Sequence, residues 1–423
     1  MFPFIILYLV LVLIRPQEYP ALVPAHLPLL PVVLIIAVLC WLFSRQKNFA
    51  APQYVLLPAF LLVMMFSEIM NGWLGGTVAE LTEFGPIVAA FVLLANATTT
   101  IRRVNIVMSV FVLCAAVLAV HGIEQSQTGI GWTGVPLIQD GRIQYVGIFN
   151  DPNDLGLLFV LTLPMAIYLS RGGGWFGIRR VFWLTAAALL LCGIYLTDSR
   201  GAMLAVALIL GVYLWRRRGL ATAALLGGAA LVAMLVLLPS RLQDLSPGEE
   251  SASGRVDAWY EGFQMFISHP LFGVGAGNFT DYNNLTAHNS FVLVLAETGF
   301  VGFILWLGFV GYCFWMTLIV LRHKPELADA QAAATWRDER AIAMTLLLSL
   351  SGCIGAAFFL SRSYAIVLYL LAALVVAAYT NARRRFPSLP GFDLAHDSLG
   401  LATAAAVAVV VLYVVVRILL AYQ

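Results

Sequence analysis

FVGFILWLGFVGYCFWMTLIVL, residues 300–321, is a run of 22 residues without a charged side chain. A helix of that length rises about 30 Å at 1.5 Å per residue, which matches the hydrocarbon thickness of a bilayer. Arg322 and Lys324 follow the run, and basic residues are typical of the cytoplasmic end of a spanning helix. The stretch therefore predicts a transmembrane helix.

Similar apolar stretches recur along the chain. Hydrophobic residues make up 61% of the sequence and charged residues 11%, a balance that excludes a soluble globular domain. We expect an all-α polytopic membrane protein with about 12 or 13 transmembrane helices, forming one integral membrane domain over residues 1–423. The expected spans are 2–14, 28–43, 54–70, 84–98, 104–120, 155–170, 181–196, 201–215, 219–238, 300–321, 341–360, 364–381 and 401–420.

The amino terminus and the cysteines refine this picture. MFPFIILYLV has neither a basic region nor a small-residue cleavage site, so we expect an uncleaved first span. All five cysteines fall inside expected spans, which favours packing residues over a disulfide framework. No spacing typical of a zinc or haem site is present, and we expect no metal and no cofactor.

The basic residues alternate between the two sides of the expected bundle. Most lie in clusters at every second loop, the pattern of cytoplasmic loops, which places the amino terminus inside. The remaining seven are all arginines on or near the opposite side, and the planar two-pronged guanidinium suits anion recognition. The clusters are Arg45/Lys47, Arg102/Arg103, Arg171/Arg179/Arg180, Arg216–Arg218, Arg322/Lys324/Arg337/Arg340 and Arg383–Arg385. The seven are Arg15, Arg142, Arg200, Arg241, Arg255, Arg362 and Arg417.

This topology puts two long polar segments outside, 121–154 and 239–289, on the periplasmic face of a bacterium. In the second segment, SGRVDAWYEGFQMFISHP has apolar residues at helical spacing and predicts an amphipathic helix, capped by Ser253 and ending before Pro270. Arg255 lies in its first turn and is a candidate for function. An ion pair of Arg255 with a neighbouring acidic residue is the alternative.

The same segment continues through LFGVGAGNF to the return of the chain into the membrane. No strand precedes these glycines, so a dinucleotide site is excluded, and we expect a turn that allows close backbone approach to a ligand or bends between helices. His288 and Asn289 lie at the return; the histidine can accept a proton from a hydroxyl, or it caps the helix or forms a structural hydrogen bond. Glu297 follows inside the apolar run, where we expect an arginine or a helix end as its partner.

Two further motifs lie at expected helix starts. In LTDSRGAML, one of the three polar residues before Arg200 caps a helix, and Arg200 lies where free N–H groups and the helix dipole favour a phosphate. In GIFNDPNDLG, the asparagines and aspartates either cap the next helix, bind sugar hydroxyls or bind a divalent cation. Arg15 lies near Glu18 and is expected to pair with it.

Four stretches together carry a resemblance: GIFNDPNDLG, LTDSRGAML, SGRVDAWYEGFQMFISHPLFGVGAGNF and AHNSFVLVLAETGFVG. In this order they resemble the O-antigen ligase and polymerase superfamily of bacterial membrane glycosyltransferases. The resemblance implies a fold of the GT-C type in the inner membrane with a periplasmic site. It implies an undecaprenyl-pyrophosphate-linked glycan as donor, a lipid-linked glycan or lipid A-core as acceptor, contact with membrane lipids, no metal and no nucleic acid.

The resemblance also implies roles for individual residues. Arg200 and Arg255 would hold the donor pyrophosphate, and His288 would be the general base that activates the acceptor hydroxyl, with inversion at the sugar. The other candidate substrate-binding residues are Arg142, Asn150, Asp154, Asn289, Arg362 and Glu297.

Several functions stay open on the sequence. A repeat-unit polymerase is slightly favoured, because the outer segment is modest and the RPQEYP start resembles chains from exopolysaccharide loci. A ligase to lipid A-core is the close alternative, and a protein O-oligosaccharyltransferase is a third. A transporter for an anionic lipid would need arginines on both sides of the midplane and repeated halves. A scaffold without chemistry is the remaining class.

Overall fold

The computed structural model describes residues 1–25, 27–45, 47–138, 141–172, 174, 176–237 and 250–421. In these ranges the regular structure is helical, apart from one isolated antiparallel bridge between Ile130 and Pro136. Arg241 lies outside the described residues. The all-α class is confirmed.

Each expected span forms a helix. Within the described residues, nine helices are long and apolar enough to cross a membrane, while α1 and α2 have only 13 and 14 residues. The helices in the expected spans are α1 (Phe2–Ile14), α2 (Leu29–Leu42), α3 (Gln53–Met70), α4 (Gly76–Ala97), α5 (Ile101–Thr128), α6 (Pro152–Leu169), α7 (Ile178–Thr197), α8 (Arg200–Arg218), α9 (Leu220–Leu237), α12 (Ser290–Arg322), α13 (Ala330–Ala357), α14 (Ile366–Arg385) and α15 (Leu394–Ala421). The shorter or surface elements are η1 (Pro16–Glu18), η2 (Val23–Ala25), η4 (Gly147–Phe149), α10 (Glu250–Ser268) and α11 (Phe279–Tyr282).

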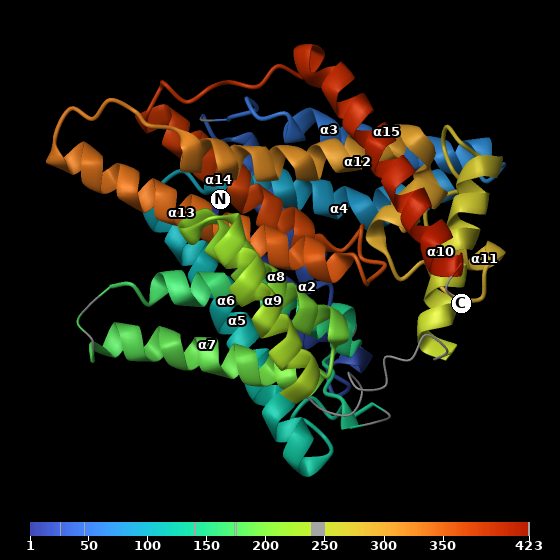
Figure 1. Ribbon diagram of the computed structural model, residues 1–423, viewed down its shortest axis with the longest axis horizontal. Helices are drawn as coiled ribbons and strands as arrows, with labels where there is room; N and C mark the ends of the chain where they lie inside the picture. Colours follow the sequence, from blue (N-terminus) through green and yellow to red (C-terminus); the bar gives the residue numbers. More distant parts are fainter. Residues whose placement is uncertain are drawn as a thin grey trace.

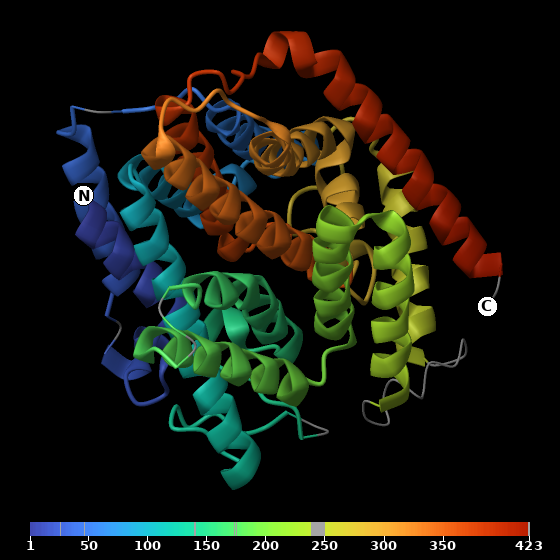
Figure 2. The same ribbon diagram turned by 60° about the vertical axis from the view of Figure 1, so that its left-hand side comes forward.

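Helices α6 and α14 form the interior and α15 the rim. In the most apolar stretches of α14 and α6, 89% and 83% of the residues are buried within the protein. In that of α15, 11% of the residues are buried. Helix α13 packs against α6, α8 and α14, and so connects helices from the earlier and the later parts of the chain. Figure 2 shows α8 and α9 as a neighbouring pair and α15 along the outer edge, where it contacts α10 and α12. Lipid therefore has access to most of α15.

The two ends of the bundle differ in composition. One end, here called the basic end, carries the loops with the basic clusters; Asn48 bonds Asn96, and Asn381 bonds Thr98 there across different loops. The other, here called the far end, holds α10, α11 and the segments 129–138, 141–151, 198–199, 286–289 and 358–365. In Figure 1 the loop after α12 lies at the left, and α10 and α11 lie at the right. The alternation expected from the basic residues fits this arrangement.

Several helices extend beyond the expected spans, and two of these differences, in α5 and α10, alter the segments at the far end. Helix α5 runs to Thr128, so the first polar segment begins at Gly129 and not at His121. Helix α10 begins at Glu250, which places Ser253 inside the helix and not at its cap, although it ends before Pro270 as expected. Both helices extend past the apolar run because a helix can continue into polar sequence until a breaker ends it.

Helix α12 is broken where the glycine-rich turn meets it. Gly299 has φ 65° and ψ −166°, and a Cβ there would collide with the backbone of Leu271. The free groups at the break are used by the turn: Val274 N–H donates to the Ala296 carbonyl at 3.0 Å, and Phe300 N–H donates to the Pro270 carbonyl at 2.9 Å. The close approach expected of these glycines is therefore made to α12.

Candidate functional site

Two helix starts meet at the far end. Asp151 caps α6, where its side chain accepts from Asn153 N–H at 2.7 Å. Ser199 caps α8 and accepts from Ala202 N–H at 3.3 Å. The Asn153 Oδ1 atom accepts from Ser199 Oγ at 2.7 Å, so the two starts are held side by side. The capping alternatives are confirmed for Asp151 and Ser199, and the positive ends of two helix dipoles lie close together.

Arg142 braces this junction. Its Nε donates to the Thr197 carbonyl at 2.9 Å and its Nη2 donates to Asn153 Oδ1 at 3.0 Å. Burial lowers the pKa of Arg142, Asp151 and Asp198 oppose the shift, and the charge of Arg200 adds to it. Arg200 is the first residue of α8, so two guanidinium groups share the region of the two helix starts. An anion is favoured there.

Asp154 forms a two-pronged ion pair with Arg362. Both carboxylate oxygens of Asp154 accept from the guanidinium, and the side chain of Asp154 is 5% exposed while that of Arg362 is 43% exposed. The pair joins α6 to the turn 358–365. Asp154 was a candidate for sugar or cation binding, but in the structure its oxygens are taken by the arginine. The exposed face of Arg362 remains directed to solvent at the far end.

The turn 358–365 also fixes the backbone of His288. Ser361 Oγ accepts from His288 N–H at 2.7 Å and from Thr286 Oγ1 at 2.8 Å. Ser290 Oγ donates to the Leu360 carbonyl at 2.6 Å. His288 has φ 47°, a left-handed conformation that costs free energy in a non-glycine residue and that these bonds hold in place.

Asn289, and not His288, caps α12. Its Oδ1 accepts from Phe291 N–H at 2.9 Å and from Val292 N–H at 3.1 Å. The residue is fully buried, and its Nδ2 has no hydrogen-bond partner among the described residues. The capping alternative for the histidine is therefore wrong, because the neighbouring residue Asn289 caps the helix.

Three charged groups act on the imidazole of His288. Burial lowers the pKa of His288 below its ordinary value of 6.5; Arg255 adds to the shift, Asp151 opposes it, and Arg362 also lowers it. These groups come from α10, α6 and the turn 358–365, so they lie within electrostatic range of one imidazole. A histidine with a lowered pKa is neutral at neutral pH and can accept a proton.

The remaining candidates have other surroundings. Glu297 is buried, accepts from Phe279 N–H at 3.3 Å and from Tyr364 OH at 2.7 Å, and so has a helix start as one partner, as expected. Asn150 is exposed after η4. Arg15 pairs with Glu18, as expected. Sequence reasoning missed Ser361 and the bridging role of Asn153, because contacts between distant segments leave no local pattern.

An apolar cavity adjoins the charged residues. It has a volume of about 420 Å³ and lies between α8, α12, α13 and the side chains of Phe358 and Phe359. Phe291, three residues after His288, lines it, and a Cβ on Gly201 would lie 3.2 Å from Phe359. The charged centre and an apolar space are therefore neighbours.

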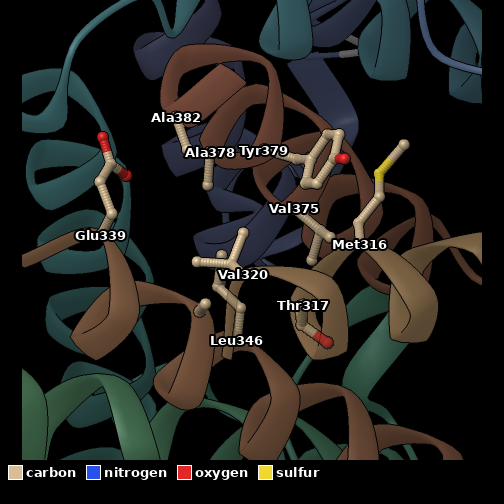
Figure 3. A pocket seen from close by; sticks show the side chains of 10 residues that line it. Met316, Thr317, Val320, Glu339, Leu346, Val375, Ala378, Tyr379 and Ala382 are labelled. Carbon is tan, nitrogen blue, oxygen red and sulfur yellow. The ribbon is translucent and has the colours of Figure 1, made fainter. Parts of the chain in front are cut away.

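A second hollow lies elsewhere and is structural. Val320, Leu346 and Val375 point into it from α12, α13 and α14 (Figure 3), and its volume of about 10 Å³ suits one water molecule. Glu339 at its margin forms an ion pair with Arg385 at the basic end. None of the candidate site residues lines it.

Comparison with known proteins adds independent support. Residues 185–307 match the family described as O-antigen ligase, a stretch that includes Arg200, Arg255, His288 and Glu297. An O-antigen polymerase of Salmonella muenchen is 26% identical over 183 residues, and the exopolysaccharide production protein ExoQ of Rhizobium meliloti (strain 1021) is 28% identical over 198 residues. Each match covers 39% of this chain and 45% of the relative, so the chain spans less than half the length of either. The resemblance to the O-antigen ligase and polymerase superfamily is confirmed.

Proposed function

We propose that this chain is a membrane glycosyltransferase that moves a glycan from an undecaprenyl-pyrophosphate carrier to an acceptor hydroxyl, with its site on the periplasmic side of a bacterial inner membrane. The observation that carries the proposal is that Arg255, Arg362 and Asp151 act on His288, while Arg142 and Arg200 act on one another next to the same Asp151. The similarity to O-antigen and exopolysaccharide proteins supports it.

Arginines supply the charge that the leaving group needs. When the bond between the anomeric carbon and the pyrophosphate oxygen breaks, negative charge grows on the phosphate oxygens. Fixed cationic donors stabilise that charge most in a site from which water is excluded. In the proposal, Arg200, at the start of α8, and Arg255, on α10, bind the pyrophosphate, and arginine donors would stabilise it without a metal ion.

His288 supplies the base. The neutral imidazole takes the proton of the acceptor hydroxyl while the acceptor oxygen bonds to the anomeric carbon and pyrophosphate departs from the opposite face. Attack from the face opposite to the leaving group inverts the anomeric centre. The proton then resides on the imidazole, whose charge the carboxylate of Asp151 favours.

The apolar cavity supplies a place for the carrier lipid. Its walls are aromatic and aliphatic side chains of α8, α12 and α13, and it begins one turn from Arg200. A polyprenyl chain entering this space would bring its pyrophosphate to the start of α8. Burial of apolar surface favours such binding by about 25 cal/mol per Å².

Within this chemistry we infer a repeat-unit polymerase of O-antigen or exopolysaccharide, with a ligase to lipid A-core as the second candidate. Two curated relatives carry polymerase and exopolysaccharide names, while the matching family is described as a ligase. A lipid transporter is disfavoured, because the arginines outside the basic clusters gather at one end of the described bundle.

The test uses purified protein in vesicles that contain lipid-pyrophosphate-linked glycan. His288→Ala should lower transfer by at least about 100-fold. The matched control is His269→Ala, because His269 is exposed on the same end and should leave transfer unchanged. Full transfer by His288→Ala would remove the general base from the proposal.

The glycans of a deletion strain distinguish the two candidate functions. Single repeats on lipid A-core indicate a missing polymerase, and long chains left on the carrier indicate a missing ligase.

A further inference from the structure

A groove at the basic end has the chemistry of a phospholipid site. It has a volume of about 410 Å³ and lies between the first turns of α5, the last residue of α6 and the first turns of α7. Arg102 and Arg179 line it from two different helices, each the second residue of its helix. It lies at the end of the bundle opposite to His288, so it is separate from the site described above.

The charge of the groove is uncompensated by its own walls. None of its described lining residues is acidic, and both arginines are exposed. Asn105 and Ser109 add polar groups on the same face of α5, one and two turns further into the bundle. A ligand that fits these walls carries negative charge near the arginines and hydrogen-bonding groups beside them.

The start of α7 adds to the same attraction. Its first residue follows Gly177, and no side chain accepts a hydrogen bond at this helix start. The amino-terminal N–H groups of a helix carry a partial positive charge that favours an anion. By contrast, α5 begins with Thr100, whose side chain accepts from Arg103 N–H at 3.2 Å. The α7 start is therefore the part of the groove best suited to a phosphate oxygen.

The rest of the groove is apolar. Trp183 lies one turn after Arg179 on α7, and Leu169 and Ile106 contribute aliphatic surface from α6 and α5. Tryptophan is typical of the boundary between headgroups and hydrocarbon, since its ring is apolar and its N–H is polar. A free phosphate ion would leave this surface unused, whereas an acyl chain attached to a phosphate would cover it.

We propose that this groove binds an anionic phospholipid of the leaflet at the basic end, with its phosphate between Arg102, Arg179 and the start of α7, and an acyl chain against Trp183. Anionic lipids gather at basic pockets between transmembrane helices, and each arginine near the surface adds to the attraction. The bound lipid would bridge α5, α6 and α7. This inference is independent of the proposed transferase activity.

Quenching of Trp183 by brominated lipids shows which lipid occupies the groove. The protein is placed in vesicles of phosphatidylcholine and phosphatidylglycerol, with bromine carried either by the phosphatidylglycerol or by an equal amount of the phosphatidylcholine. Trp183→Phe identifies the contribution of Trp183 among the ten tryptophans of the chain. Brominated phosphatidylglycerol should be enriched beside Trp183 by about tenfold over brominated phosphatidylcholine. Equal quenching by the two lipids would overturn the proposal.

Charge variants provide the matched comparison. Arg102→Gln with Arg179→Gln should remove the preference, whereas Lys324→Gln with Arg337→Gln, which removes two exposed charges from the same end outside the groove, should retain it. A preference that survives the first pair contradicts the proposal, and the comparison of lipids in the unaltered protein stands even if that pair does not fold. Inorganic phosphate should not compete with the lipid. Sodium chloride of equal ionic strength is the control. Loss of the preference in phosphate alone would indicate a site for the headgroup only and would contradict the proposed lipid site.

Discussion

The two ends of the bundle both contain arginines, but they hold them in different ways. At the far end, Arg142 bonds Asn153 and Thr197, and Arg362 is locked to Asp154. At the basic end, Arg103 donates to the Ala97 carbonyl and Arg340 to the Leu321 carbonyl, and Arg385 is paired with Glu339. The two-pronged pair of Arg362 with Asp154 fixes the direction of that guanidinium, whereas a single bond to a carbonyl, as for Arg103 to Ala97 or Arg340 to Leu321, can also be made by an ammonium group. The ends therefore differ in whether arginine can be replaced by lysine.

The largest expected contrast between the ends is in that replacement. Arg200→Lys keeps the charge at the start of α8 but loses the two-pronged donor, and we expect glycan transfer to fall by about 10- to 100-fold. Arg217→Lys, at the basic end of the same helix, should leave transfer unchanged. Initial rates in vesicles measure both. Equal rates for the two variants would contradict the expected difference between the two ends of the bundle.

The next contrast concerns the ion pair of the far end. Asp154→Asn leaves Arg362 without its carboxylate, and we expect about a tenfold loss of transfer and a loss of about 1–2 kcal/mol in stability, reduced because Arg362 is partly exposed. Thermal unfolding in detergent and initial rates measure the two effects. The double variant with Arg362→Gln should lose less stability than the sum of the single variants. Strict additivity would mean that the pair does not couple.

Ser361 offers a smaller and more specific effect. Ser361→Ala removes the acceptor that holds His288 N–H, and we expect a fall of a few-fold in kcat with little change in KM, because the base is displaced while the pyrophosphate site is intact. Ser361→Thr keeps the hydroxyl and should restore most of the rate. A change confined to KM would contradict the positioning role.

The smallest expected effect is a shift in pH dependence. The pKa of His288 lies below 6.5, so the neutral base is present above that pKa and transfer should be lost only as the pH falls through it. Arg255→Gln removes a positive charge that repels the imidazolium, which raises the pKa of His288 and moves the acid limb of kcat/KM to higher pH. The position of the limb is the readout, whatever the rate. An unchanged limb would separate Arg255 from His288.

Much of the bundle followed from the sequence, and the site did so only in part. Long apolar runs predicted the helices of the expected spans, because burial in lipid requires continuous apolar length, and α10 followed from its amphipathic spacing. Asp151 and Ser199 were recognised as caps because capping is local. By contrast, the pairing of Asp154 with Arg362 joins segments 208 residues apart. The last turns of α5 and the first turn of α10 lie outside the apolar pattern of the sequence. The far end was therefore predicted as a set of residues and not as a set of contacts.

The break at Gly299 sets a limit on mutational tolerance. This position has a left-handed φ and no room for a Cβ beside Leu271, so each of the two constraints alone disfavours every other residue. A library randomised at this codon and selected for cell-surface glycan should return glycine alone. Neighbouring Val301 is partly exposed and should accept several apolar residues in the same selection. The contact between the glycine-rich turn and the broken helix α12 therefore depends on a glycine at position 299.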